Sequence, residues 1–137
     1  MRSFTFTIPG PPRGKGRPRA YKRGAHIAMY TDDKTAAYEN LVTLAYKAAG
    51  GEKLNGAIGV LVSMRHPIPK STSKAKRAGM IVGEIKPTVK CDADNCLKAV
   101  LDGLNGVAYD DDKQVVTIIV TKRYDENPRV DVEISEV

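Results

Sequence analysis

The stretch spanning residues 90–114 constrains this chain most, because acidic side chains lie on both sides of one short amphipathic segment. Four apolar residues recur there at the spacing of one helical face, which predicts a helix with a buried stripe. They are Leu97, Val100, Leu101 and Leu104. Aspartates favour the first turn of a helix and Asn-Gly favours its end, so we expect the helix to begin near Asp92 and to stop at Asn105-Gly106.

Five aspartates flank this predicted helix. Asp92 and Asp94 lie at its start, and the triplet 110–112 follows it on a predicted turn between two extended segments. In a chain with a net charge of +6, so many neighbouring carboxylates repel one another unless a cation neutralises them. Mg²⁺ takes hard oxygen ligands and a small number of protein carboxylates. Asp92, Asp94 and one acid of the triplet therefore form a candidate Mg²⁺ site.

Lys98 lies four residues after Asp94 and shares its face of the predicted helix. A lysine in that position can offset the charge that develops on a phosphoryl group during transfer. Each feature taken singly also has a structural interpretation, since acids cap helices, Asp94 and Lys98 can form a surface ion pair, and acidic turns are solvated. The interpretation as a site rests on the occurrence of all these features around one helix.

The chain matches the pattern KxDxDNxxKxxxDxLNG, followed shortly by DDxQV. The matching residues are Lys90, Asp92, Asp94, Asn95, Lys98, Asp102, Leu104, Asn105 and Gly106, then Asp111, Asp112, Gln114 and Val115. This pattern resembles the signature of the RusA family of Holliday junction resolvases. The run IPGPPRGKGRPR and the later YTDDKTAAYE also resemble the opening of that family, so the resemblance covers most of the chain.

The resemblance implies a homodimeric, Mg²⁺-dependent endonuclease, with Mn²⁺ as a substitute ion, that makes paired nicks in four-way DNA junctions. It implies that Asp92, Asp94 and Asp112 bind the metal and that Lys98 is essential for cleavage. Alignment on Gln114 selects Asp112, and Asp111 stays an alternative because this chain has three acids where the family has two. A metal-activated water is the expected nucleophile, since no serine or cysteine is convincingly paired with a histidine.

Two cysteines and two histidines give little support to a zinc site. Cys91 and Cys96 are close in sequence, but His26 and His66 are distant from them and from each other. We expect both cysteines to be reduced thiols, with Cys91 near the helix start as a small packing residue or a partly exposed thiol.

Two basic segments precede the acidic stretch. Residues 13–23 hold six cations and no acid, and their glycines and proline predict a loop or irregular arm. The second segment includes a short predicted helix that Ser71–Ser73 cap and Gly79 ends. Cations on both sides of a carboxylate site attract a DNA backbone. The candidates for backbone contacts that do not read bases are Lys15, Arg17, Arg19, Lys74, Lys76, Arg77 and Lys90.

The remaining chain predicts a sheet and one longer helix. Alternating residues predict strands at 3–8, 57–64 and 129–136, the last as an outer strand. The segment 115–124 is apolar on both faces, which predicts a central strand or a subunit contact. A helix is expected from Asp32 or Asp33 to about Ala49. Its expected inward residues are Ala37, Leu41, Leu44, Ala45 and Ala48, and Tyr30, Tyr38 and Tyr46 are interpreted as packing residues.

A length of 137 residues with 42% apolar residues suits one domain over residues 1–137. We expect an α+β fold, with a mixed sheet of four to five strands and two main helices packed on it. No apolar run approaches the length of a membrane span and no signal-peptide core is present, so we expect a cytoplasmic protein without a membrane partner. Two alternatives to the nuclease remain: a non-catalytic basic protein that binds DNA junctions, and a Ca²⁺-binding structural turn.

Overall fold

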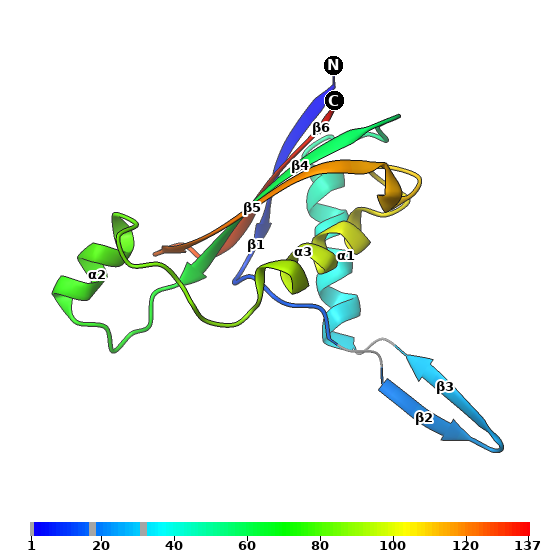
Figure 1. Ribbon diagram of the computed structural model, residues 1–137, viewed down its shortest axis with the longest axis horizontal. Helices are drawn as coiled ribbons and strands as arrows, with labels where there is room; N and C mark the ends of the chain where they lie inside the picture. The colour runs from blue at the N-terminus through cyan, green and yellow to red at the C-terminus, as the bar shows by residue number, and fades with distance from the viewer. Residues whose placement is uncertain (1, 17–18, 31–32) are drawn as a thin grey trace.

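A computed structural model describes residues 2–16, 19–30 and 33–137. Its elements are β1 (Ser3–Pro9), β2 (Arg19–Arg23), β3 (His26–Tyr30), α1 (Asp33–Ala48), β4 (Ile58–Pro67), α2 (Lys74–Ile81), α3 (Ala93–Leu104), the 3₁₀ turn η1 (Asp112–Gln114), β5 (Val115–Asp125) and β6 (Arg129–Glu136). Helices α1 and α3 cover one face of a four-stranded mixed sheet, as Figure 1 shows. The predicted α+β fold is therefore confirmed.

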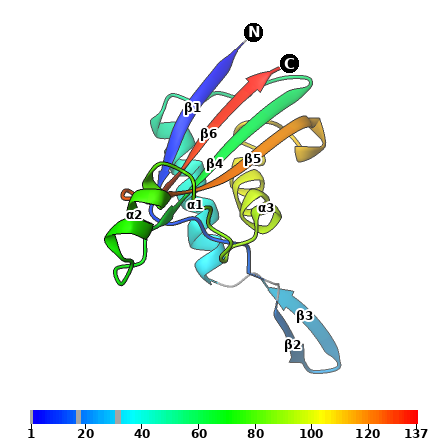
Figure 2. The same ribbon diagram turned by 60° about the vertical axis from the view of Figure 1, so that its left-hand side comes forward.

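The strands of this sheet are in the order β1-β6-β4-β5. Strand β6 is antiparallel to both of its neighbours, β1 and β4, whereas β4 and β5 are parallel. Parallel neighbours need a crossover, and here the connection contains α2 and α3. The connection leaves the carboxyl end of β4 and returns along the helix layer through α3 to the start of β5, where Val115 pairs with Ile58 at the start of β4 (Figure 2).

Two predictions about strand position are wrong. The expected outer strand, β6, lies inside the sheet between β1 and β4. Its alternation of buried and exposed residues reflects a sheet with one covered face, which an interior strand also shows. The expected central strand, β5, is at the edge, where Val116, Ile118 and Ile119 are 62%, 44% and 52% exposed. The alternative interpretation of β5, a subunit contact, is not tested by its position.

The core lies between the sheet and the two helices. From α1 it receives Tyr38, Val42 and Tyr46, and the Tyr46 ring packs edge-on against the Phe6 ring at a centroid distance of 5.2 Å. The predicted inward face of α1 is confirmed for Leu41 and Ala45, which pack against the core, and wrong for Ala37, Leu44 and Ala48, which are exposed. Helix α1 is rotated so that its large tyrosine rings, rather than its small alanines, fill the space above the sheet. The packing role expected for Tyr38 and Tyr46 is confirmed, and the side chain of Tyr30 lies outside the described part.

Helix α3 packs closely on α1 because Gly103 has no side chain. A Cβ atom there would lie 2.6 Å from the Val42 Cβ and 2.7 Å from the Glu39 carbonyl oxygen. The Thr43 hydroxyl donates a hydrogen bond of 2.6 Å to the Gly103 carbonyl, which fixes the crossing. The predicted boundaries of α3 are confirmed: Asp92 is the N-cap, and Asn105 is the C-cap before a glycine with φ of 83°.

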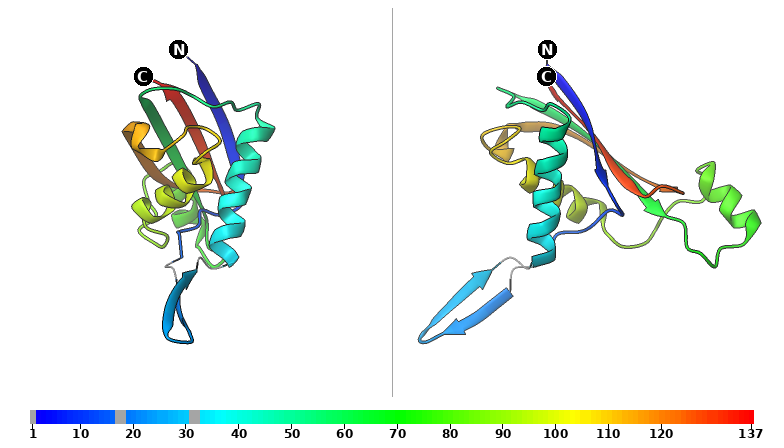
Figure 3. Two further views of the ribbon diagram at one scale, coloured as in Figure 1. Left: turned by 90° about the vertical axis from the view of Figure 1, so that its right-hand side faces the viewer. Right: turned by 180° about the vertical axis from the view of Figure 1, so that it is seen from behind.

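Part of the first basic segment forms a hairpin. Residues 11–16 are irregular, as predicted, but β2 and β3 pair antiparallel, so the prediction of a loop or irregular arm through residue 23 is wrong there. Gly24, with φ of 60°, supplies the left-handed conformation that the tight turn requires. The hairpin projects from the body beside the start of α1 (Figure 3).

Helix α2 lies at the other end of the molecule from this hairpin (Figures 1 and 3). Its predicted cap is confirmed, because the Ser73 hydroxyl accepts a hydrogen bond of 3.3 Å from the Lys76 backbone N–H. The helix continues past Gly79 to Ile81, and a glycine with φ of 84° follows at residue 83. Among the described helices, none combines the length and apolarity that crossing a membrane requires.

Candidate functional site

The first turn of α3 presents two carboxylates to solvent. Asp92 is the N-cap residue, yet its side chain makes no capping hydrogen bond, and Asp94 follows in the first turn. Both residues are exposed. Neither carboxylate has a hydrogen bond or ion pair with another residue in the described ranges. Two free anions next to each other at a fixed helix end can accept a cation without breaking an existing contact.

Lys98 links this helix to the acidic triplet. Its Nζ lies 3.1 Å from the Asp102 Oδ1 and 3.7 Å from the Asp112 Oδ2, so it bridges α3 and η1. The hydrogen bond to Asp102 is the main reason why the pKa of Lys98 is above its ordinary value. The predicted site residues Lys98 and Asp112 are therefore brought together, and Lys98 pairs with Asp102 rather than with Asp94, which the spacing also allowed.

Asp102 lies between two lysines. Its carboxylate accepts hydrogen bonds from Lys98 and from Lys15 of the irregular segment, and Lys15 Nζ is also 3.8 Å from Glu39 of α1. Burial by itself raises the pKa of Asp102, but the two lysines together outweigh it and leave the pKa below its ordinary value. Lys15 was predicted to contact DNA; here it neutralises an acid and ties the basic segment to α1 and α3.

The three acids of the triplet have different surroundings. The Asp110 carboxylate pairs with Lys53 at 2.8 Å. Asp111 caps η1, because its side chain accepts a hydrogen bond of 2.9 Å from the Lys113 N–H while the Gln114 side chain bonds back to the Asp111 N–H. This reciprocal arrangement is a capping box. Asp112 is the member of the triplet that reaches Lys98 and α3.

The predicted metal ligands are not gathered into one cluster. Within residues 2–16, 19–30 and 33–137, no three Asp, Glu, His or Cys side chains lie close enough to bind one ion. The donor chemistry nevertheless fits Mg²⁺, since Asp92 and Asp94 offer unpartnered carboxylate oxygens at one helix end. The third predicted carboxylate, that of Asp112, is held by Lys98.

The predicted DNA contacts divide into several groups. Lys74 and Lys76 are exposed on α2, while Arg77 pairs with Glu126 at 3.3 Å. Lys90 is exposed two residues before Asp92. Arg17 and the side chain of Arg19 lie outside the described residues. Helix α2 and the β2-β3 hairpin extend on opposite sides of the start of α3, as Figure 1 shows, so the two basic segments lie on either side of the helix end that carries Asp92 and Asp94.

Two contacts near the site were not predicted. Asp102 belongs to the sequence pattern, and its position four residues after Lys98 is the sequence signal for this ion pair. Lys122 of β5 donates a hydrogen bond of 2.7 Å to the Val89 carbonyl and so supports the segment before α3. That contact joins residues 33 positions apart, and no local pattern indicates it.

The cysteines lie beneath the first turn of α3. Both are free thiols; Cys91 is half-buried and Cys96 is buried. A hydrogen bond from Cys96 is the main cause that lowers the pKa of the Cys91 thiol to about 7, and the same contact together with burial raises the pKa of Cys96. Cys91 also lines a cavity beside the start of α1.

Comparison with known proteins adds two findings. The family model described as endodeoxyribonuclease RusA matches residues 9–135, nearly the whole chain. The chain is also similar to the protein named "Uncharacterized protein YqaN" of Bacillus subtilis (strain 168), with 38% identity over 140 residues. That alignment covers 100% of this chain and 99% of the relative.

Proposed function

Because this chain belongs to the RusA endodeoxyribonuclease family, we propose that it is a metal-dependent nuclease that resolves four-way DNA junctions by paired nicks. The observation that carries the proposal is the bridge made by Lys98, which joins the helix of Asp92 and Asp94 to Asp112. A chain with a net charge of +6 in which unpaired carboxylates lie between two basic segments suits a polyanionic substrate and a cation bound between them.

Asp92, Asp94 and Asp112 would hold a Mg²⁺ or Mn²⁺ ion in this proposal. When bound, the ion would polarise the scissile phosphate and lower the pKa of the attacking water. For Asp112 to take part, its carboxylate exchanges the contact with Lys98 for the ion. Asp111 is the poorer candidate for third ligand, because its carboxylate caps η1 and its release would cost the turn a hydrogen bond.

Lys98 stabilises the transition state in the proposed mechanism. Its ammonium lies at the surface between the two acidic segments, where negative charge would develop on the phosphate oxygens. Asp102 orients the ammonium through the hydrogen bond of 3.1 Å and keeps it protonated. Asp102 is thus a positioning residue. Lys15 donates a hydrogen bond to its second carboxylate oxygen, Oδ2.

The proposed enzyme acts as a homodimer, since two symmetric cuts need two sites. Strand β5 supports this proposal because it is an edge strand with Val116, Ile118 and Ile119 exposed, and unpaired apolar edges tend to associate. Sedimentation of the wild-type protein and of Ile119→Lys tests it. A monomeric wild-type protein, or an Ile119→Lys variant as dimeric as the wild type, would contradict the use of this edge.

A synthetic mobile junction tests the proposed activity. The purified protein is incubated with the junction with and without Mg²⁺, and the strands are resolved on a denaturing gel. We expect symmetric nicks in opposite strands that require the metal. Asp94→Asn should abolish nicking and leave junction binding intact. The matched control Asp110→Asn, which alters a carboxylate paired with Lys53, should cut as the wild type does.

The same assay separates the alternatives. Junction binding with steep salt dependence but without nicks at any metal concentration would favour a non-catalytic binding protein, which accords with the ungathered carboxylates. Thermal stabilisation by Ca²⁺ without affinity for DNA would favour a structural ion site. Unchanged cutting by Asp94→Asn would refute the assignment of the carboxylates.

A further inference from the structure

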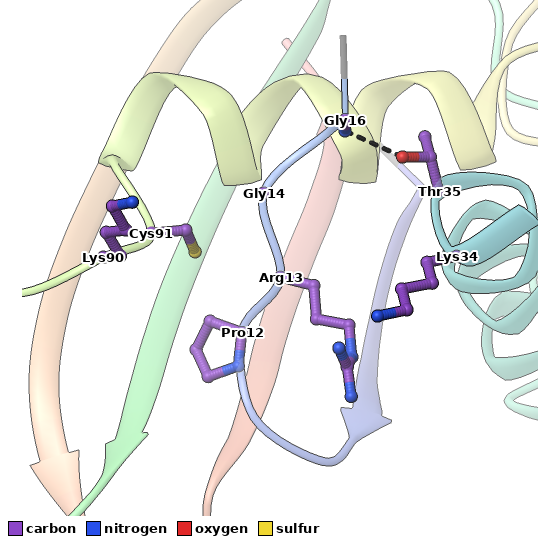
Figure 4. Close-up of a pocket in the computed structure, with 8 residues that line it drawn as sticks. All are labelled: Pro12, Arg13, Gly14, Gly16, Lys34, Thr35, Lys90 and Cys91. Atoms are coloured by element: carbon purple, nitrogen blue, oxygen red, sulfur yellow. Dashed lines mark hydrogen bonds between the residues drawn. The ribbon is translucent and has the colours of Figure 1, made fainter. Parts of the chain in front are cut away.

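A cavity of about 430 Å³ lies between the irregular segment that follows β1, the first turn of α1 and the approach to α3. Three cationic residues, Arg13, Lys34 and Lys90, contribute to its walls together with Gly14 and Gly16. Figure 4 shows the side chains of Arg13 and Lys34 turned toward each other on one side of the glycine segment, with Lys90 on its other side. Among the described residues, none of those that line the cavity is acidic.

The three cations of this cavity have no acidic partner within the described parts of the chain. This distinguishes them from Lys15 and Lys98, which are neutralised nearby. Two like charges that face the same space repel each other, and an anion between them removes that repulsion. The cavity is therefore suited to an anionic group that can accept hydrogen bonds from a guanidinium and an ammonium.

The walls of the cavity are fixed by contacts with both helices. The Lys15 N–H donates to the Asn95 carbonyl of α3 at 3.3 Å, and the Gly16 N–H donates to the Thr35 hydroxyl of α1 at 2.7 Å. Gly14 packs so closely on α3 that a Cβ atom there would lie 2.5 Å from the Asn95 Nδ2. Only glycine lets the segment lie this close to α3. Arg13 is thus presented from a segment anchored at both sides.

A second hollow of about 360 Å³ adjoins the first and shares Arg13 and Lys34. Its other walls come from Ala37, Tyr38 and Leu41 of α1 and are largely apolar. The Tyr38 side chain is buried, and its hydroxyl interacts with the Arg13 backbone. An apolar hollow beside a cationic cavity matches a sugar next to a phosphate.

We propose that this cavity binds a backbone phosphodiester of the DNA substrate, adjacent to the phosphate that is cut. Arg13 and Lys34 bind the phosphate, the neighbouring deoxyribose packs against Tyr38 and Leu41, and the strand continues past Lys90 to Asp92. The cavity and the carboxylates are contiguous because Cys91 lines the cavity and directly precedes Asp92. The inference rests on the proposed function and assigns Arg13 and Lys34 a role in positioning the strand.

Two lysines of the same helix provide a matched pair of variants. Lys34→Gln removes a cation of the cavity, whereas Lys47→Gln removes an exposed cation from the last turn of α1. The two positions are about 20 Å apart along the helix axis at 1.5 Å per residue. Junction binding is measured without Mg²⁺ over a series of salt concentrations. Lys34→Gln should lower the slope of log K against log salt by about 1, and Lys47→Gln should leave it unchanged.

A phosphate-by-phosphate test locates the contact. Single neutral methylphosphonates are placed in turn at the positions around the cut site of the junction. For the wild-type protein, one position next to the cut should weaken binding about tenfold. For the double variant Arg13→Gln/Lys34→Gln, the same position should have no effect, because the contact is already lost. Circular dichroism melting verifies that both variants are folded.

Several outcomes would overturn the inference. Equal salt slopes for Lys34→Gln and Lys47→Gln would show that the cavity does not contact the backbone. A loss of affinity confined to strands that carry a terminal phosphate, or full competition by millimolar inorganic phosphate, would indicate a site for free or terminal phosphate. A wild-type protein that neither binds nor cuts junctions refutes the proposed function itself, whereas cutting by wild type with an unaltered double variant refutes only the cavity.

Discussion

Arg13 and Lys15 are two residues apart in one basic run, yet their surroundings differ completely. Lys15 is bonded to Asp102 and lies near Glu39, so its charge is used within the protein. Arg13 faces a cavity that no acidic residue of the described ranges lines. The difference teaches that the nearest carboxylate decides what a cation does, and that membership of a basic run does not. The paired lysines, Lys15 and Lys98, organise the site, and the unpaired cations remain available to a ligand.

The largest effect is expected at the paired lysine nearest the acids. Lys98→Met should reduce the rate of junction cleavage about 100-fold or more, because a charge that stabilises the transition state is lost. Junction affinity should change little. Single-turnover cleavage with saturating enzyme measures the rate, and Lys113→Met, next to Asp112 in sequence, is the control. A variant that loses affinity instead would place Lys98 with the unpaired, ligand-binding cations.

The next effect is expected at Asp102, the acid that pairs with Lys15 and Lys98 and so distinguishes them from the unpaired cations. Asp102→Asn leaves Lys15 and Lys98 with a neutral partner, so the free energy of unfolding should fall by about 1–3 kcal/mol near pH 7. Because the pKa of Asp102 is lowered in the folded protein, its stabilisation is present above about pH 4 and is lost as the pH falls through that lowered pKa. Urea unfolding from pH 7 to pH 2 measures whether the variant and the wild type converge in acid.

A smaller effect is expected at Gly14, which lies between the unpaired Arg13 and the paired Lys15 in the chain. Gly14→Ala places a methyl group 2.5 Å from the Asn95 Nδ2 and 3.2 Å from the Cys91 Cβ. The segment must move away from α3, at a cost of about 1 kcal/mol in unfolding free energy. Arg13 moves with it, so junction affinity should fall a few-fold. The free energy of unfolding and the junction affinity are measured on the same variant. A loss of stability with unchanged affinity would contradict the link between the position of Arg13 and DNA binding.

The smallest effect is expected in the salt dependence of a Lys15 variant. Lys15→Met should leave the salt slope of junction binding as in the wild type, because its charge is already neutralised by Asp102. Its melting temperature should nevertheless decrease. A reduction of the slope by about 1 would mean that Lys15 leaves Asp102 to contact DNA, and the distinction between paired and unpaired cations would then fail.

Local features of the fold could be predicted from the sequence. The spacing of apolar residues, the N-cap at Asp92 and the Asn105-Gly106 stop gave α3 its correct bounds, because each acts within one or two helical turns. The alternation in β1 and β6 gave their buried faces for the same reason. The order of the strands depends on pairing between segments far apart in the chain, so the edge position of β5 could not be predicted.

In the site, too, local contacts could be predicted from the sequence and contacts between distant segments could not. The pairing of Lys98 with its helix neighbours is local and readable from an i, i+4 spacing. The contact of Lys15 with Asp102 joins residues 87 positions apart, and the cavity between Arg13 and Lys34 exists only because the irregular segment is folded against two helices. The rotation of α1 toward its tyrosines likewise depends on the shape of the sheet beneath it.

The pairing of β1 with β6 has a practical consequence for handling the protein. The two ends of the chain emerge side by side, joined by a hydrogen bond of 3.0 Å from the Glu136 N–H to the Arg2 carbonyl, at the end of the molecule opposite the β2-β3 hairpin (Figure 1). An affinity tag, a fluorophore or a surface tether at either terminus therefore lies away from the hairpin but close to the 110–114 turn, because Val137 bonds to Ala57 and Gln114 to the adjacent Gly56. A short linker between the ends would also permit a circular permutant opened at Gly50-Gly51.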